Sequence, residues 1–135
     1  MSFLLVGRNP KARLSMGASH ASALSAVLAE LSGKEPEFMQ HATEQQCKIW
    51  AALLRENLSR VKLIKGVNKR GRKYAFLVVQ GADIRHEFSN GHYKHDAIDF
   101  VPSWEMANDL DDEWKMIMNG FVEFLESCGG ILRVV

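Results

Sequence analysis

The chain has 135 residues, of which 47% are hydrophobic and 24% are charged, and its formal net charge is +1. This length and composition are those of one globular domain with one core, so we predict a single domain over residues 1–135. No apolar run approaches the roughly 18 residues that a membrane span requires, which excludes a membrane-spanning segment. Abundant large aliphatic residues at low net charge also exclude an intrinsically disordered chain.

The cysteine content favours a reducing compartment. Cys47 and Cys128 both fall on apolar helical stripes, and neither has a second cysteine or a histidine at zinc-ligand spacing. The N-terminus shows no export signal. We therefore expect a cytoplasmic protein with two reduced thiols in its core.

The N-terminal part predicts a strand and a helix. The apolar run Phe3–Val6 ends at Gly7 and indicates a strand buried on both faces, and the residues from there to Arg13 are expected to form a loop. Apolar residues then recur at helical spacing over Ala18–Ser32, and Gly33 is typical of a helix stop.

The middle of the chain predicts a helix and then a hairpin. Thr43 opens a capping-box pattern, and one apolar face continues to about Asn57. The period of the apolar residues then changes to two, and Tyr74–Val79 is apolar on both faces. We predict two strands joined through Gly66–Arg72, with Tyr74–Val79 central in the sheet.

A second hairpin is predicted over Ile84–Ala97. Asn90-Gly91 is the preferred type I′ turn, because both of its positions need a positive φ. Folding the chain there places Phe88 opposite Tyr93 and creates two pairs of opposite charge, which cross-strand packing favours.

The C-terminal part predicts two helices and a last strand. Ser103 can cap a short helix, and Asp111 or Asp112 can cap a longer one that ends before Gly129-Gly130. Ile131–Val135 is expected as a terminal strand. The resulting element order indicates an α+β fold, with a mainly antiparallel sheet of about five to six strands and helices packed on one face.

Charge is distributed unevenly along the chain. Residues 1–82 carry 13 basic and 5 acidic side chains, a balance of +8, whereas residues 83–135 carry 4 and 11, a balance of −7. This split is expected either for two charged surfaces that face different partners or for two halves that neutralise each other across the fold.

The basic zone, residues 60–73, is a candidate nucleic-acid-binding segment. On a protruding hairpin its cations could contact phosphates, with glycines that allow close approach of the backbone. The alternatives are a solvated loop that protects a sheet edge and a docking site for an acidic protein. The candidate residues are Lys62, Lys65, Lys69, Arg70, Arg72 and Lys73.

The acidic zone begins the last helix. Its spacing lacks the alternating oxygen ligands and the central glycine of a calcium loop, so acids that favour a helix N-terminus are the simpler explanation. As part of a larger surface these residues could bind a basic partner. They are Asp109, Asp111, Asp112 and Glu113.

His86 and His95 face each other in the predicted second hairpin, which makes them candidates for a metal site or for acid–base chemistry. A metal site needs a third ligand that no motif supplies, so ordinary half-buried histidines are the simpler interpretation. No phosphate-binding loop, nucleophile elbow or zinc-protease motif occurs in the sequence, and we predict no cofactor.

These features favour a small accessory or regulatory protein, comparable to the inhibitors and immunity proteins of bacteria and phages, rather than an enzyme. We expect it to bind a macromolecule through a charged surface, with a protein as the favoured partner and homo-oligomer formation left open. Nucleic-acid binding through residues 60–73 is the first alternative. A metal-dependent hydrolase or nuclease that uses His86 and His95 is the second.

Overall fold

The computed structural model of the chain describes residues 2–33, 40–67, 71, 73–82 and 104–135. Its elements follow in the order β1 (Ser2–Gly7), β2 (Arg13–Gly17), α1 (Ala18–Ser32), α2 (Glu44–Glu56), the 3-10 helix η1 (Leu58–Arg60), β3 (Val61–Val67), β4 (Lys73–Val79), the 3-10 helix η3 (Trp104–Met106), β5 (Ala107–Asn108), α4 (Asp112–Ser127) and β6 (Ile131–Val134). The second hairpin predicted at residues 84–97, with its His86 and His95, lies outside the described residues, as does Ser103.

The described strands form two antiparallel sheets of three strands each, in the orders β2-β1-β6 and β4-β3-β5. The α+β class and the antiparallel pairing are as predicted, but the described strands do not form one sheet, and two of them, β2 and β5, were not predicted. Both edges of β1 are occupied, by β2 and β6, so the β3–β4 hairpin has no edge of β1 to join. Helix α1 contacts β4 of one sheet and β1 and β2 of the other.

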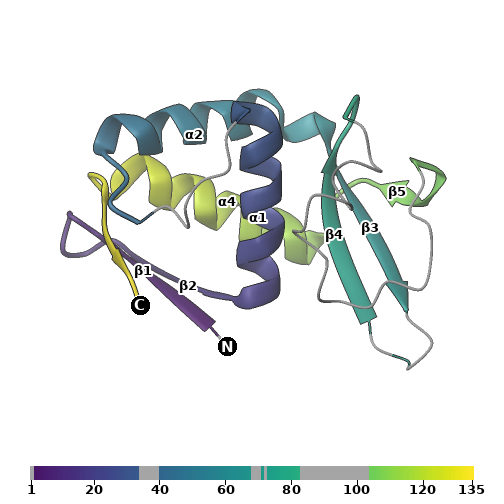
Figure 1. Cartoon of the computed structure of the whole chain (residues 1–135), viewed down its shortest axis with the longest axis horizontal. Coiled ribbons are helices and arrows are strands. Elements are labelled where there is room, and N and C mark those ends of the chain that lie inside the picture. The colour runs from purple at the N-terminus through teal and green to yellow at the C-terminus, as the bar shows by residue number, and fades with distance from the viewer. Residues whose placement is uncertain (1, 34–39, 68–70, 72, 83–103) are drawn as a thin grey trace.

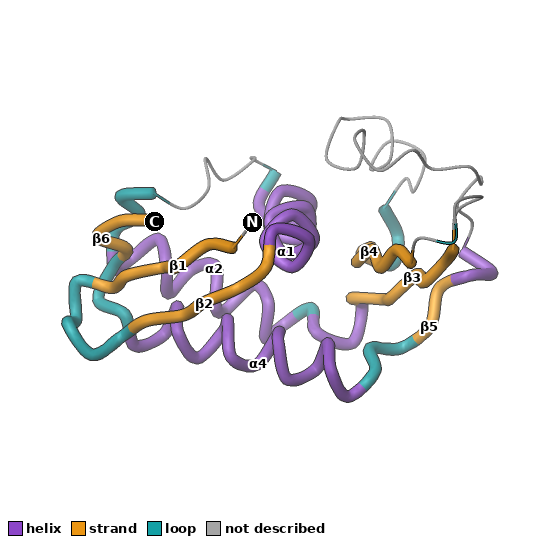
Figure 2. Tube along the Cα trace, turned by 90° about the horizontal axis from the view of Figure 1, so that it is seen from below, coloured by secondary structure: helices purple, strands orange, loops and turns teal. Residues whose placement is uncertain are grey.

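Figures 1 and 2 show this arrangement from two sides. The sheet of β1, β2 and β6 lies at one end of the molecule, the sheet of β3, β4 and β5 lies at the other, and α1 stands between them. In Figure 2 helix α4 runs along the length of the molecule past both sheets. None of the helices in the described part of the chain is long and apolar enough to cross a bilayer.

Strand β2, which was not predicted, begins at Arg13, the last residue of the loop that was predicted after β1. Its residues pair with β1 from Val6 opposite Arg13 to Ser2 opposite Gly17. The reversal is fixed by a hydrogen bond from the Gly7 amide to the Ala12 carbonyl at 2.9 Å, together with a turn at Asn9. Leu14 and Met16 alternate with polar residues, a period of two that is visible in the sequence but too short to stand out.

The helices begin and end where local sequence predicts. Gly33 follows α1 with a φ of 75°, a left-handed conformation that glycine adopts without a steric penalty. The Thr43 hydroxyl accepts a hydrogen bond from the Gln46 amide at 3.1 Å, and the Asp111 carboxylate accepts one from the Trp114 amide at 2.9 Å. All three boundaries confirm the predictions.

The β3–β4 hairpin is also confirmed, with Leu63 opposite Leu77. Of the strands that the structure describes, however, β3 is the middle one, whereas Tyr74–Val79 was predicted to be central. Strand β4 is continuously apolar because its two faces enter different clusters. Leu77 and Val79 belong to the main core, and Val78 packs with Ile64, Met106 and Ala107.

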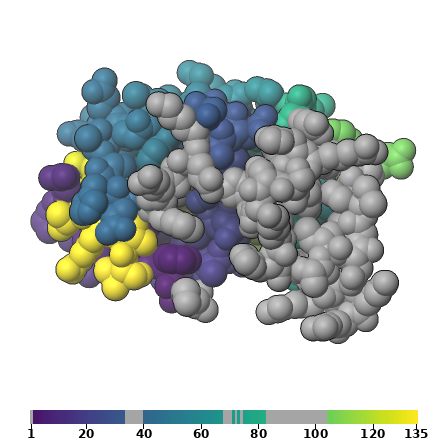
Figure 3. All heavy atoms as spheres, in the orientation of Figure 1, coloured from purple at the N-terminus to yellow at the C-terminus, as the bar shows by residue number. Residues whose placement is uncertain are grey.

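The main core is continuous from one sheet to the other. It contains Leu5 and Met16 from the first sheet, Leu63 and Leu77 from the second, and buried residues of helices α1, α2 and α4. The two ends of the chain are also joined, because the Leu4 and Val135 backbones exchange hydrogen bonds of 3.1 and 2.9 Å. In Figure 3 these first and last segments lie side by side at the surface.

Candidate binding groove beside the paired charged zones

The described members of the basic and acidic zones pair with each other. Strand β5 lies antiparallel to β3 with Leu63 opposite Asn108, so the register brings Lys62 to Asp109. The Lys62 Nζ donates to the Asp109 Oδ1 at 2.6 Å, and Lys65 donates to the Asp111 carboxylate. Of the two interpretations of the uneven charge, mutual neutralisation therefore applies to these four residues.

The ionisation of these groups reflects their pairing. The hydrogen bond and the positive charge of Lys62 lower the pKa of Asp109. The pKa of Asp111 is lowered by the hydrogen bond from Lys65 and by the one from the Trp114 amide, and the same pairing raises the pKa of Lys65. Both aspartates are thus held in the charged form and are already engaged by partners within the chain.

The other zone residues are less constrained. Asp112 and Glu113 lie exposed in the first turn of α4, where acids stabilise the helix, and neither has a hydrogen bond or ion pair within the described part of the chain. Arg60 donates to the Gln80 carbonyl at 2.9 Å and to the Asn57 side chain at 2.7 Å. Lys73 is exposed on β4, and the other three candidates, Lys69, Arg70 and Arg72, lie outside the described residues.

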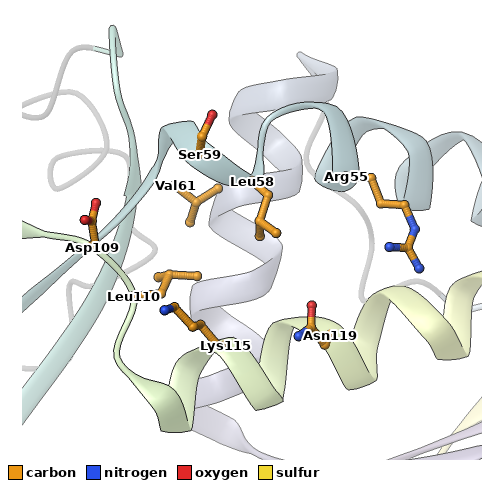
Figure 4. Close-up of a pocket in the computed structure, with 8 residues that line it drawn as sticks. All are labelled: Arg55, Leu58, Ser59, Val61, Asp109, Leu110, Lys115 and Asn119. Carbon is orange, nitrogen blue, oxygen red and sulfur yellow. The ribbon is translucent and has the colours of Figure 1, made fainter.

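Next to the paired zones is a hollow of about 520 Å³, which we call the α2–α4 groove. Figure 4 shows its lining, contributed by the end of α2, by η1 and the start of β3, and by the β5–α4 turn and α4. The lining residues are Arg55, Leu58, Ser59, Val61, Asp109, Leu110, Lys115 and Asn119.

An ion pair stands at each end of the α2–α4 groove. At the end marked by Arg55 in Figure 4, that guanidinium donates two hydrogen bonds to Glu126, at 2.8 and 2.5 Å. At the other end Asp109 is held by Lys62. Hydrogen bonding to Arg55 lowers the pKa of Glu126, so both acids at the ends of the groove are charged and engaged.

The floor of the groove is apolar. Val61 and Leu110 are only 2% and 7% exposed, and they form a base that the exposed Leu58 extends to the surface. Leu58 is held in this position because η1 follows α2 directly, through a hydrogen bond from the Arg60 amide to the Asn57 carbonyl. A large aliphatic side chain is thereby kept partly in water, at 40% exposure.

Three polar side chains of the groove have spare hydrogen-bonding capacity. Ser59, Lys115 and Asn119 form no hydrogen bond or ion pair with any residue that the structure describes. Lys115 and Asn119 thus offer an ammonium and an amide beside an apolar floor, whereas the Ser59 hydroxyl points away from them in Figure 4. Such a surface can bind a ligand that carries an anionic or polar group next to an apolar group.

The described residues include the predicted reduced thiols but not the histidines of the predicted metal site. Within these ranges no group of three or more His, Cys, Asp or Glu could hold a metal ion, and His86 and His95 lie outside them. Cys47 and Cys128 are free and buried in the core, as predicted. Burial, with a smaller effect of Cys128, raises the pKa of Cys47 to about 12, which makes it a poor nucleophile at neutral pH.

A second hollow, of about 510 Å³, lies on the outer face of α2. The described residues that line it all belong to that helix, and two of them, Glu44 and Lys48, pair with each other at 3.0 Å. The exposed Ile49 lies among them at 47% exposure. This surface has no buried floor from another element, and it serves below as a matched control.

Comparison of the chain with models of protein families, with curated proteins and with solved structures found no match. The α2–α4 groove was not apparent from the sequence, because its lining comes from separate segments that carry no motif. The only sequence signal was Leu58, an apolar residue in the short polar link between a helix and a strand. The chemistry of the groove is therefore the guide to function.

Proposed function

We propose that the protein is a non-enzymatic accessory or regulatory protein, of the inhibitor or immunity type, that binds another protein through the α2–α4 groove. The observation that carries this proposal is the combination of a partly exposed Leu58 and a buried apolar floor with Lys115 and Asn119, whose side chains bond to no residue that the structure describes. Central pockets of this kind accept the anchoring side chains that dominate protein interfaces. The two free, buried thiols support a reducing compartment such as the cytoplasm.

The openness of the groove supports a macromolecular partner over a small molecule. Of the eight described residues that line it, six are exposed and two, Val61 and Leu110, are buried. Small-molecule sites commonly enclose about 70–90% of their ligand, which exposed walls do not achieve. A protein partner makes further contacts around the groove, and these contacts exclude water from it.

Nucleic-acid binding through residues 60–73 stays a prediction. Arg60, Lys62 and Lys65 are already engaged by groups of the same chain, which reduces the positive charge that this face offers to phosphates. A mobility-shift titration at two salt concentrations tests it. Binding by Lys69, Arg70, Arg72 and Lys73 predicts a slope of log affinity against log salt of roughly −3 to −4 on duplex DNA.

The metal-dependent hydrolase hypothesis also stays a prediction, because both of its histidines lie outside the described residues. Metal analysis of the purified protein, with His95→Ala as control, tests it directly. Stoichiometric metal in the wild-type protein that is lost in the variant would favour an enzyme over a binding protein.

Capture of partners on the immobilised full chain tests the proposed function. Leu58→Glu places a charge on the wall of the groove, whereas Ile49→Glu makes the same change at a similarly exposed position on the outer face of α2. We expect the same protein to be recovered by the wild type and by Ile49→Glu, and its recovery to fall at least about tenfold with Leu58→Glu. Equal recovery by both variants would contradict binding at the groove.

A further inference from the structure

We propose that the segment bound in the α2–α4 groove presents a carboxylate next to an apolar side chain, as an acidic and apolar stretch of the partner protein. This inference rests on the proposed function and names the chemistry that the groove selects.

Among the described residues around the groove, one cation has no acid as a hydrogen-bonding partner. The carboxylate of Asp109 is taken by Lys62, and the guanidinium of Arg55 is taken by Glu126, with Glu123 as a further acid that acts on Arg55. Lys115 lines the groove between these pairs. Its charge acts on the nearby Asp109, but its ammonium donates to no acid within the described ranges.

The neighbours of Lys115 favour a carboxylate as the anion that binds there. Asn119 lies four residues further along α4, so the two side chains share one face of the helix. An ammonium and an amide at this spacing can both donate to one carboxylate, and such charge-assisted hydrogen bonds are about twice as strong as neutral ones. Ser59 lines the opposite wall, but its hydroxyl points away from these two side chains in Figure 4.

The apolar part of the occupant follows from the floor. Leu58, Val61 and Leu110 lie in the same hollow as the polar side chains, so a carboxylate held by Lys115 brings the adjacent residue of a peptide over aliphatic surface. A basic or uncharged segment would fill the floor but leave the ammonium of Lys115 without an anion. The two features together favour an acidic residue beside a leucine-like one.

The test uses isotope-labelled full-length protein and capped hexapeptides in which leucine alternates with glutamate, glutamine or lysine. We expect the leucine–glutamate peptide to shift the amide NMR signals of Ser59, Lys115 and Asn119. The leucine–glutamine peptide should bind about threefold to tenfold more weakly, and the leucine–lysine peptide weakest of all. Lys115→Glu should reverse this order, whereas the control Lys48→Glu, on the outer face of α2, should leave it unchanged.

Four outcomes would overturn the inference. Equal binding of the glutamate and glutamine peptides would show that the carboxylate is not recognised. If no amide NMR signal of the groove residues shifted, the peptide would not bind in the groove. Hexanoate that binds as tightly as the glutamate peptide would identify a small-molecule site. A partner whose capture depends on Leu58 but not on the charge of Lys115 would leave the proposed function standing while this inference fails.

Discussion

Gly7, the last residue of β1, packs directly on the end of α4. A Cβ at this position would lie 2.8 Å from the Cys128 carbonyl oxygen and 2.9 Å from the Cys128 Cβ. We expect Gly7→Ala to lower the free energy of unfolding by about 1–3 kcal/mol, because neither atom is the end of a flexible side chain. Urea denaturation measures this change.

Gly120 provides the matched control for that substitution. It lies inside α4, and a Cβ there would meet no atom within 4 Å. Gly120→Ala should raise the free energy of unfolding by about 0.4–1 kcal/mol, since alanine restricts the unfolded chain and favours the helix. If both substitutions destabilised the protein equally, the close packing around Gly7 would not be the cause.

Asp111 combines two roles that substitution can separate. Asp111→Ser keeps a hydroxyl that can cap α4 but loses the ion pair with Lys65, whereas Asp111→Ala loses both. Thermal unfolding should therefore rank the wild type above Asp111→Ser, and Asp111→Ser above Asp111→Ala. An equal loss in the two variants would show that the cap contributes nothing.

The same residue predicts a dependence on pH. The pKa of Asp111 in the folded protein lies below its ordinary value of 3.8, so its contribution to stability is present above that value and is lost as the pH falls through the folded-state pKa. The difference in melting temperature between the wild type and Asp111→Ala should thus shrink from about pH 7 to about pH 2. A constant difference would contradict the pairing.

At the scale of elements, the two-residue strand β5 owes its position to few interactions. It pairs with β3 over only two residue positions, and the lysines of β3 pair with acids that follow β5 in the chain. Lys62→Asp should place like charges together and accelerate hydrogen exchange at Ala107 and Asn108. Adding Asp109→Lys should restore protection by reversing the pair.

Salt provides the control for that experiment. The Asp109 side chain is 86% exposed, so this ion pair is open to screening. Near 1 M salt, where the screening length is about 3 Å, wild type and Lys62→Asp should exchange at more similar rates. A difference that is independent of salt would point to packing of the lysine stem rather than to charge.

An element could be predicted from the sequence where the residues that determine it lie close together in the chain. The bounds of α1 and the caps of α2 and α4 follow from residues within one helical turn, so Gly33, Thr43 and Asp111 were sufficient evidence. Strand β2 was missed because only Leu14 and Met16 mark its period. The groove could not be predicted, because Leu58 and Lys115 meet only through the packing of α2 against α4.

At the scale of the whole molecule, the division of the strands between two sheets does not divide the core. Leu5 and Met16 belong to the same buried cluster as Val61 and Leu77. We therefore expect both sheets to unfold in one cooperative transition, with coincident midpoints by far-ultraviolet circular dichroism and by tryptophan fluorescence. Separate midpoints would show that each sheet folds as its own unit and would contradict the predicted single domain.

The reactivity of the buried thiols reports how often the core of the folded chain opens. Cys47 and Cys128 are both 0% exposed, and the pKa of Cys47 is raised to about 12, so Cys47 presents almost no reactive thiolate to an alkylating reagent in the intact protein. Each alkylation of Cys47 by iodoacetamide then records a moment when the core has opened. Gly7→Ala should therefore increase the rate at which Cys47 is alkylated, and Gly120→Ala should decrease it. The alkylation rate thus reports how often the deepest part of the core opens to solvent.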